Sequence, residues 1–331
     1  MLSDVINAIL DNGKGILAAD ESNSTAGKRL ADIGLENSEE NRRAMREMLF
    51  TTPQARNYIG GVILYDETIH QADSQGKPFV QDMFEAGVIP GIKVDQGLVA
   101  YNDSEVEKIT EGLESLSNRL PEYKMLGAKF AKWRAVYTVS QDGKYPTAEL
   151  VEEASARLAK YAKVCQGQDI VPIVEPEVLM EDGEYSSHDM QRCAEVTKQV
   201  NQMLFAKLDE YQVDLSGILL KPNMVVAGKN CQQQGSVEEV ATATLQVLKE
   251  VVPAVVGGIV FLSGGQTPQQ ATQHLNAINK LGDAPWKLSF SYGRALQQEA
   301  LQAWAGNDLQ AGQDKFLEVA QANSLAAQGK L

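Results

Sequence analysis

The chain has 331 residues, of which 44% are hydrophobic, and carries a formal net charge of −14. This length supports a large core, in one big domain or in two domains of ordinary size. The acidic balance argues against nucleic acid or an anionic membrane surface as a partner, although a basic pocket can still admit a small anionic substrate.

The cysteines and the first residues both indicate a cytoplasmic protein. Cys165, Cys193 and Cys231 are odd in number and lack the spacing of metal ligands, which predicts thiols in a reducing compartment. The opening stretch MLSDVINAIL lacks the basic region of a signal peptide. No segment reaches the roughly 18 consecutive apolar residues that a membrane span needs, so we expect no membrane partner.

Short apolar runs recur along the chain, and a longer amphipathic stretch follows most of them. The runs occupy residues 15–20, 60–67, 91–95, 128–134, 170–177, 217–223, 257–265 and 288–295. Their starts lie roughly 30 to 45 residues apart, which is close to the length of one strand plus one helix. The amphipathic stretches predict helices at 38–50, 105–119, 147–165, 187–211, 236–250 and 268–280. Several begin with capping signals, such as Thr267-Pro268.

Eight strand-plus-helix units predict an α/β fold, a (β/α)₈ (TIM) barrel, as a single domain over residues 1–331. Extra helices are expected at 2–11 and 308–327. The runs are continuously apolar, as strands covered on both faces should be. An open doubly wound sheet is the competing fold, and it is less favoured because no run is followed by a dinucleotide-binding or P-loop glycine motif.

Charged residues stand at the ends of five of these runs. They are Asp20 and Glu21, Lys93 and Asp95, Lys132 and Arg134, Glu175 and Glu177, and Lys221. Side chains alternate along a strand, so Lys221 shares a face with Leu219, and Lys132 shares one with Phe130. A single charge at a strand end is usually only solvated. Five strands with this ending predict one shared cluster at the C-terminal rim of the barrel, where active sites of this fold lie.

Two glycine turns follow the seventh and eighth predicted strands, where this fold usually binds phosphate. These turns and their flanks provide Ser263, Gly264, Gly265, Ser291, Gly293 and Arg294. Backbone N–H groups, hydroxyls and a guanidinium suit an anion, although tight turns alone would also explain the glycines.

The segment that leaves the first run, residues 19–29, has two interpretations of equal weight. It is either a helix cap followed by a solvated first turn, or a second anion site opposite the first. The residues of that second site would be Ser22, Thr25, Lys28 and Arg29.

A lysine at the inner end of an apolar strand, such as Lys221, must lose its proton, form an ion pair or take part in the reaction. Its amine attacks a carbonyl only when unprotonated, so its pKa must fall from about 10.4 through burial or through the charge of Lys132 and Lys93. The resulting iminium draws electrons from a neighbouring C–C bond. The carboxylates available as acid and base are Glu175, Glu177 and Asp20. This chemistry indicates a lysine-dependent aldolase acting on a phosphorylated sugar.

Other mechanisms fit the sequence less well. His70, His188 and His274 all fall in predicted helices or loops, and no paired histidine motif exists, so a zinc aldolase lacks its usual ligands and no metal is expected. A nucleophile elbow for acyl transfer is also missing. A pyridoxal phosphate enzyme would use a lysine and a phosphate site in a barrel, but no partner for its pyridine ring is identified.

Long stretches of the chain resemble class I fructose-1,6-bisphosphate aldolases, from about residue 13 to residue 330. They include GKGILAADES, GGVILYDET, GIKVD, AKFAKWR, IVPIVEPE, LLKPNMV, FLSGGQ, FSYGRALQ and ANSLAAQGK. The resemblance implies a (β/α)₈ barrel that reversibly cleaves fructose 1,6-bisphosphate to dihydroxyacetone phosphate and glyceraldehyde 3-phosphate. It implies that the enzyme needs no cofactor, because the reaction runs through a Schiff base on Lys221. It also implies a homo-oligomer, usually a tetramer, and sedoheptulose 1,7-bisphosphate as a second substrate.

Residue roles also follow from this resemblance. Lys221 is implied as the Schiff-base nucleophile, Glu175 as the dehydrating acid and base, and Asp20 as the group acting at the C4 hydroxyl during cleavage. Glu177 and Lys132 are implied to support these steps. The resemblance places Lys93 in the same charged site and implies that Arg134 touches substrate.

The two phosphate sites are implied in the same way. Ser263, Gly264, Gly293 and Arg294 match the pocket for the ketose-end phosphate. Ser22, Thr25, Lys28 and Arg29 match the segment that meets the other phosphate, with Thr25 where many relatives have serine.

One departure concerns the C-terminal end. Animal relatives continue into a mobile tail whose final tyrosine helps proton exchange at the enamine carbon, whereas this sequence stops at Leu331. We expect another group to transfer that proton, or the step to be slower. The alternative from another class is a barrel that has lost its chemistry and binds a partner, but the full set of charged residues argues against it.

Overall fold

Eight parallel strands form a closed barrel in this computed structural model, which describes residues 1–331. Around the barrel the strands follow the order β1, β10, β9, β8, β7, β6, β3, β2. Their bounds are β1 (Gly15–Ala19), β2 (Ile59–Leu64), β3 (Ile89–Lys93), β6 (Phe130–Tyr137), β7 (Val171–Val178), β8 (Leu219–Leu220), β9 (Gly258–Phe261) and β10 (Leu288–Tyr292). The predicted (β/α)₈ barrel is therefore confirmed, with a strand at each of the eight apolar runs.

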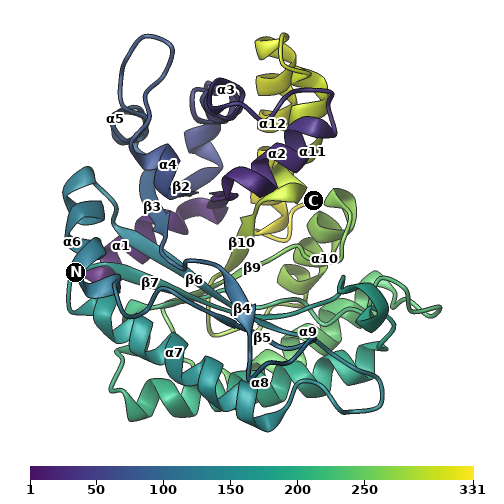
Figure 1. Cartoon of the computed structure of the whole chain (residues 1–331). Coiled ribbons are helices and arrows are strands. Elements are labelled where there is room, and N and C mark those ends of the chain that lie inside the picture. Colours follow the sequence, from purple (N-terminus) through teal and green to yellow (C-terminus); the bar gives the residue numbers. More distant parts are fainter.

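Helices cover the outside of the barrel, and Figure 1 shows α7, α8 and α9 along one side and α11 and α12 beside α2 and α3. The helices are α1 (Leu2–Ile9), α2 (Asn23–Ala31), α3 (Glu39–Phe50), α4 (Asp66–Ile69), α5 (Phe79–Ala86), α6 (Leu116–Leu126), α7 (Ala148–Gln166), α8 (Met190–Glu210), α9 (Val237–Val251), α10 (Pro268–Leu281), α11 (Arg294–Trp304) and α12 (Leu309–Ala326). Short 3₁₀ turns are η1 (Asp11–Gly13), η2 (Ala55–Asn57), η3 (Gly183–Tyr185) and η4 (Leu215–Gly217). None of the helices combines the length and the apolarity that crossing a membrane requires.

The capping signals mark real helix starts. Ser38 accepts a hydrogen bond from the backbone N–H of Asn41 at the start of α3. Ser236 and Thr267 each form a reciprocal capping box, at α9 and α10. These side chains satisfy backbone donors that a helix cannot pair within itself, and the helix starts therefore agree with the predicted ones.

The predicted helix at 105–119 is wrong. Residues Lys108–Thr110 form strand β5, which pairs antiparallel with β4 (Leu98–Ala100), and the helix α6 begins only at Leu116. The β-branched pair Ile109 and Thr110 suits a strand, and Thr110 donates a hydrogen bond from its hydroxyl to the backbone oxygen of Arg134 in β6. This tertiary contact outweighs the weak helical periodicity of the segment.

The core has an inner and an outer part. Side chains inside the barrel form a small cluster with α1, whose Ile6 and Ile9 close its N-terminal end. Phe130 belongs to this cluster, and Gly91 on the neighbouring strand leaves room for its ring, since a methyl group at Gly91 would overlap it. The larger cluster lies between the barrel and its helices. The inner cluster supplies the apolar floor on which the charged strand ends stand.

Candidate active site

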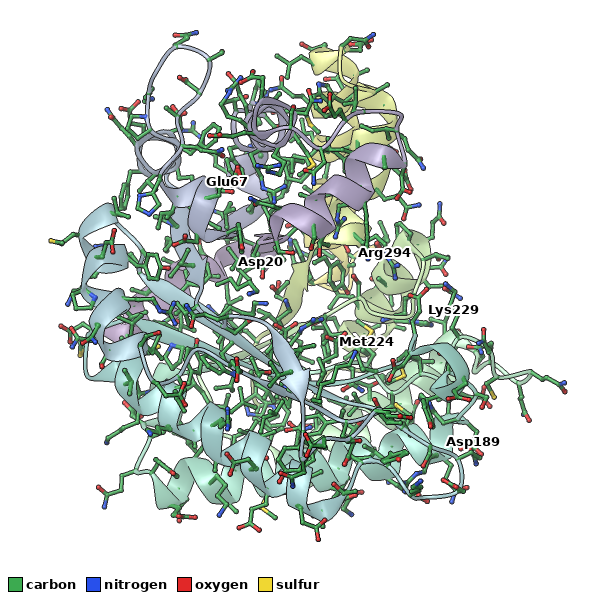
Figure 2. The ribbon with its side chains drawn as sticks, viewed as in Figure 1. Asp20, Glu67, Asp189, Met224, Lys229 and Arg294 are labelled. Atoms are coloured by element: carbon green, nitrogen blue, oxygen red, sulfur yellow. The ribbon has the colours of Figure 1, made fainter.

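A cavity of about 480 Å³ lies at the C-terminal ends of the barrel strands. Most of the predicted site residues line it: Asp20, Ser22, Thr25, Arg29, Lys93, Lys132, Arg134, Glu175, Glu177, Lys221, Ser263, Gly264, Ser291, Gly293 and Arg294. Lys28 and Gly265 instead line a neighbouring groove of about 780 Å³, which Arg29 and Arg294 also reach. Figure 2 labels Asp20 and Arg294, which lie on the wall of this cavity.

Strand alternation explains how an apolar interior ends in a ring of charges. Phe130, Ile173 and Leu219 belong to the inner apolar cluster. Two residues further along each strand, and therefore on the same face, stand Lys132, Glu175 and Lys221. The site is one layer of side chains above the floor of the barrel.

Lys221 and Glu175 form a buried ion pair at the centre of this layer. The Nζ atom of Lys221 lies 3.0 Å from Oε1 of Glu175. The two residues are only 4% and 3% exposed, so water screens the pair little. A carboxylate this close to the amine can exchange a proton with it directly.

Lys132 links three carboxylates, one within β7 and two just beyond the ends of β1 and β3. Its Nζ atom lies 2.8 Å from Oδ2 of Asp20, 3.4 Å from Oε2 of Glu175 and 3.9 Å from Oδ2 of Asp95. Burial disfavours the charged ammonium, but Asp20 and the other two carboxylates outweigh it and raise the pKa of Lys132. Lys132 is therefore a fixed positive charge at neutral pH.

The carboxylates of Asp20 and Glu175 remain ionised despite their burial. Burial raises the pKa of Asp20, but Lys132 and Lys221 more than reverse this and hold it well below its usual range. Burial likewise raises the pKa of Glu175, but the positive charges of Lys221 and Lys132 outweigh burial and lower it. Both groups are therefore proton acceptors in the resting site.

Lys93 is paired with the other charged residue at the end of its strand, Asp95. Its Nζ atom lies 2.6 Å from Oδ1 of Asp95 and donates a hydrogen bond to the backbone oxygen of Asp95 at 2.8 Å. Asp95 also faces Lys132. The carboxylate of Asp95 thus compensates the positive charge of Lys93. Asp95 follows Lys93 by two residues, so both side chains can lie on the same side of the chain at the strand end.

Glu177 lies apart from the central pair. Its Oε2 atom accepts a hydrogen bond from Nη1 of Arg134 at 2.8 Å, and Glu177 is the main cause of the raised pKa of Arg134. A methyl group placed on Gly264 would lie 2.9 Å from Oε1 of Glu177. Glu177 therefore stands against the glycine turn after β9 and holds Arg134 beside it.

The ends of β9 and β10 present anion-binding groups to the cavity. Gly293 is the N-cap of α11 and lines the cavity together with Arg294, so the start of that helix, whose first backbone N–H groups have no partner within the helix, lies at the cavity wall. The Oγ atom of Ser291 is buried, lines the cavity and has no hydrogen-bond partner in the protein. These donors are placed for an anion at this wall.

The segment 19–29 forms a helix start that also faces the cavity. Ser22 is the N-cap of α2 and accepts a hydrogen bond from the backbone N–H of Thr25 at 3.4 Å. Arg29 extends from the next turn, and its guanidinium lies 3.6 Å from the position that a Gly293 Cβ would occupy. Arg29 is thus beside the turn after β10, and it lines both the cavity and the neighbouring groove, whereas Lys28 lines only the groove.

An arginine–glutamate–arginine cluster supports this arrangement, and it includes Arg46, which was not among the predicted residues. Glu21 binds Arg29 and Arg46 at 3.0 Å each, one through each carboxylate oxygen. Gln297 donates hydrogen bonds to Glu21 and to the backbone oxygen of Ala18. Glu21 adjoins Asp20 in the sequence, but nothing in the sequence of α3 indicates that Arg46 is buried.

The histidines lie away from the strand ends. His70 ends α4, His188 precedes α8, and His274 lies in α10, where burial lowers its pKa to about 4. Within residues 1–331, no group of three or more histidine, cysteine, aspartate or glutamate side chains is arranged to hold a metal ion. The three cysteines form no disulfide.

Comparisons with known proteins agree on one family. The family model described as fructose-bisphosphate aldolase class-I matches residues 1–331. A probable fructose-bisphosphate aldolase class 1 of Xanthomonas axonopodis pv. citri is 52% identical over 99% of this chain and 98% of its own length. The cytosolic fructose-bisphosphate aldolase 4 of Arabidopsis thaliana is 49% identical over 96% of this chain and 80% of its own. Fructose-bisphosphate aldolase of Plasmodium falciparum, solved in complex with TRAP and a small-molecule inhibitor, superposes with a TM-score of 0.96 at 44% identity, covering 99% of this chain and 94% of that one.

Proposed function

Because the chain belongs to the class I fructose-bisphosphate aldolase family, we propose a role for each charged group at the end of its barrel strands. The protein is a metal-independent lyase that reversibly cleaves fructose 1,6-bisphosphate to dihydroxyacetone phosphate and glyceraldehyde 3-phosphate through a lysine Schiff base. The observation that carries the assignment of roles is the 3.0 Å pair between Lys221 and Glu175 inside the cavity.

Lys221 is the proposed nucleophile and Glu175 its proton carrier. Glu175 takes a proton from the Lys221 ammonium, and the free amine forms a bond to the C2 carbonyl carbon of the ketose. A proton on the newly bonded nitrogen then moves to the former carbonyl oxygen, which gives a carbinolamine. Glu175 then returns its proton to that hydroxyl, which leaves as water and yields the iminium.

Asp20 is the proposed base for the cleavage step. Its carboxylate accepts the proton of the C4 hydroxyl while the C3–C4 bond breaks, and the bond's electron pair moves into the iminium to form an enamine. The C4 carbon becomes the aldehyde of the departing product. The lowered pKa of Asp20 and its 2.8 Å contact with Lys132 support this role, since the group is ionised before the reaction begins.

Binding of the two phosphates is assigned to opposite parts of the mouth. Ser263, Gly264, Ser291, Gly293 and Arg294 are proposed for the ketose-end phosphate, supported by the unpaired donors at this wall. Ser22, Thr25, Lys28 and Arg29 are proposed for the other phosphate, and Arg29 also lies beside Gly293. Lys132 and Glu177 are proposed to support dehydration and cleavage. Lys93 and Arg134 are proposed to contact the substrate, and Gly265 is proposed to belong to the phosphate-binding turn.

Several finer properties are proposed by likeness. Sedoheptulose 1,7-bisphosphate would share the same ketose-end contacts and is proposed as a second substrate. A homo-oligomer is proposed, together with a cytoplasmic location, for which the relative named cytosolic and the free thiols provide support. We also propose that residues 1–331 form a single domain, since β1 near one end of the chain pairs with β10 near the other.

Borohydride trapping tests the assignment of the nucleophile. Dihydroxyacetone phosphate and borohydride are added to the protein, and the reduced adduct is located by peptide mass mapping. The expected result is one three-carbon phosphate adduct on Lys221, with none on Lys221→Met and an unchanged yield on the surface variant Lys198→Met. An adduct elsewhere, or none in the wild-type protein, contradicts the proposal. A barrel that only binds the sugar would give no adduct, and loss of activity with a chelator would indicate a metal mechanism instead.

A further inference from the structure

One carboxylate outside the predicted site binds two cationic side chains at the edge of the active-site cavity. Glu181, in the loop after β7, accepts from Nη2 of Arg294 at 3.2 Å through Oε2, and its Oε1 binds Nζ of Lys229 in the loop after β8. Figure 2 shows Lys229 and Arg294 on the same side of the barrel. Two loops and the first residue of α11 thus meet at one carboxylate.

The backbone fixes Glu181 beside the turn that follows β9. Lys229 donates a backbone hydrogen bond to the oxygen of Met180 at 2.9 Å, which ties the two loops together. Gly265 has a φ of +74°, and a methyl group there would overlap Met180, the residue just before Glu181. The position of Glu181 is therefore set by the fold rather than by its own side chain alone.

Arg294 stands on the boundary between two spaces. It lines both the cavity and the neighbouring groove, whereas Glu181 and Lys229 line only the groove. An ion pair with Glu181 therefore draws the guanidinium toward the groove. A phosphate bound at Ser263 and Gly293 would draw the same group in the opposite direction.

We propose that Glu181 is a positioning residue that holds Arg294 at the rim and thereby sets the affinity of the site for the ketose-end phosphate. Lys229 shares the carboxylate of Glu181 and so weakens its hold on Arg294. This inference rests on the phosphate-binding role proposed above for Arg294. It adds that Glu181 competes with the phosphate for the guanidinium of Arg294, and that Lys229 weakens this competition.

The strength of the contact suits a reversible hold. The side chains of Glu181, Lys229 and Arg294 are 37%, 57% and 46% exposed, so solvent screens the pair. Hydrogen bonds from Lys229 and then Arg294 lower the pKa of Glu181, so the carboxylate is charged at neutral pH. Exposed pairs of this kind shift an equilibrium by about two- to fivefold, which a phosphate dianion can overcome.

Steady-state kinetics of Glu181→Gln test the proposal. Freed from Glu181, Arg294 should bind phosphate more readily, so KM for fructose 1,6-bisphosphate and Ki for inorganic phosphate should both fall about two- to fivefold. The kcat should stay within about twofold, because no group at the reacting carbons changes. Glu181→Asp keeps the negative charge on a shorter side chain, so its KM should lie between the values of the wild-type protein and Glu181→Gln. An unchanged or raised KM in Glu181→Gln overturns the proposal.

Two matched variants separate this hold from a general charge effect. Glu184→Gln removes one exposed negative charge from the same loop, and Glu184 has no contact with Arg294, so KM should not change. If Glu184→Gln lowers KM as much as Glu181→Gln, only the overall charge matters and the hold on Arg294 is refuted.

Lys229→Gln tests the moderating cation. It should raise KM about twofold alone and leave KM unchanged in the Glu181→Gln background, because the carboxylate that it shares is gone. A rise in both backgrounds would show that Lys229 binds phosphate itself and would overturn its proposed part. Borohydride trapping on Lys221 is run on each variant: normal trapping with an unmoved KM refutes only the hold, whereas no trapping in the wild-type protein refutes the proposed function.

Discussion

Lys221 and Lys132 bind the two oxygens of a single buried carboxylate, that of Glu175. Lys221 lies 3.0 Å from Oε1 and Lys132 lies 3.4 Å from Oε2. A second carboxylate, that of Asp20, also binds Lys132, with 2.8 Å between Oδ2 and Nζ. The proposed nucleophile, its proton carrier and the proposed base for cleavage are thus joined in one chain of contacts.

Glu175→Gln should abolish most activity without preventing substrate binding. The amide cannot carry a proton between the Lys221 amine and the carbinolamine hydroxyl, so the rate of Schiff-base formation should fall about 10²- to 10⁴-fold. Single-turnover trapping with borohydride measures this step. The surface variant Glu153→Gln is the control and should match the wild-type protein. A Glu175→Gln rate within about threefold of wild type would contradict the role of proton carrier.

Lys132→Met should move the acid limb of the pH–rate profile to higher pH. Lys132 helps to hold the pKa of Asp20 below its usual range, so without it that pKa rises. Asp20 acts only when deprotonated, and more alkaline solution is then needed to ionise it. The profile of kcat for cleavage measures the shift, with Lys198→Met as the control. A lower rate with an unmoved acid limb would mean that Asp20 is not the base.

The stability of the protein should depend on the ionisation of Asp20 at low pH. Its folded-state pKa lies below the value of about 4 for an unfolded chain, so its contribution is complete above about pH 4 and disappears as pH falls through the lowered folded value. Urea unfolding at a series of pH values measures this. Asp20→Asn should lose stability less steeply than wild type below about pH 4. Parallel curves for the two proteins would contradict the prediction.

Glu21→Gln should destabilise the fold strongly. Arg46 is only 1% exposed, and removing its counter-charge leaves a buried guanidinium uncompensated, at about 3–5 kcal/mol of unfolding free energy. Urea unfolding measures the loss. The exposed pair between Lys198 and Glu250 is the control, and Glu250→Gln should cause no measurable change. A Glu21→Gln variant as stable as wild type would mean that Arg46 finds other solvation.

Much of the site follows from local rules that a sequence displays. A strand alternates its faces, so apolar Phe130 and Leu219 on the inner face predict Lys132 and Lys221 on that face two residues later. The parallel barrel then brings all such ends to one rim. Most of the residues predicted for the site therefore line the cavity, although Lys28 and Gly265 lie in the neighbouring groove and Gly97 and Leu98 line the cavity without having been predicted.

Partners across the site could not be derived in this way. Lys93 pairs with Asp95, and Glu177 pairs with Arg134 rather than joining Lys132. Such choices depend on distances of a few ångströms between side chains on different strands. The helix expected at 105–119 failed for a related reason, because the pairing of β5 with β4 is a contact that local periodicity does not contain.

The sequence alone determined the barrel, its eight strands, the rim that carries the charges and the resemblance to one aldolase family, because each depends on patterns of a few residues or on long matching stretches. Only the tertiary structure decided which carboxylate serves which cation. It placed Glu175 between Lys221 and Lys132, Glu21 between Arg29 and Arg46, and Glu181 between Arg294 and Lys229. Electrostatic pairing acts over a few ångströms between residues far apart in the chain, and only the folded barrel defines those distances.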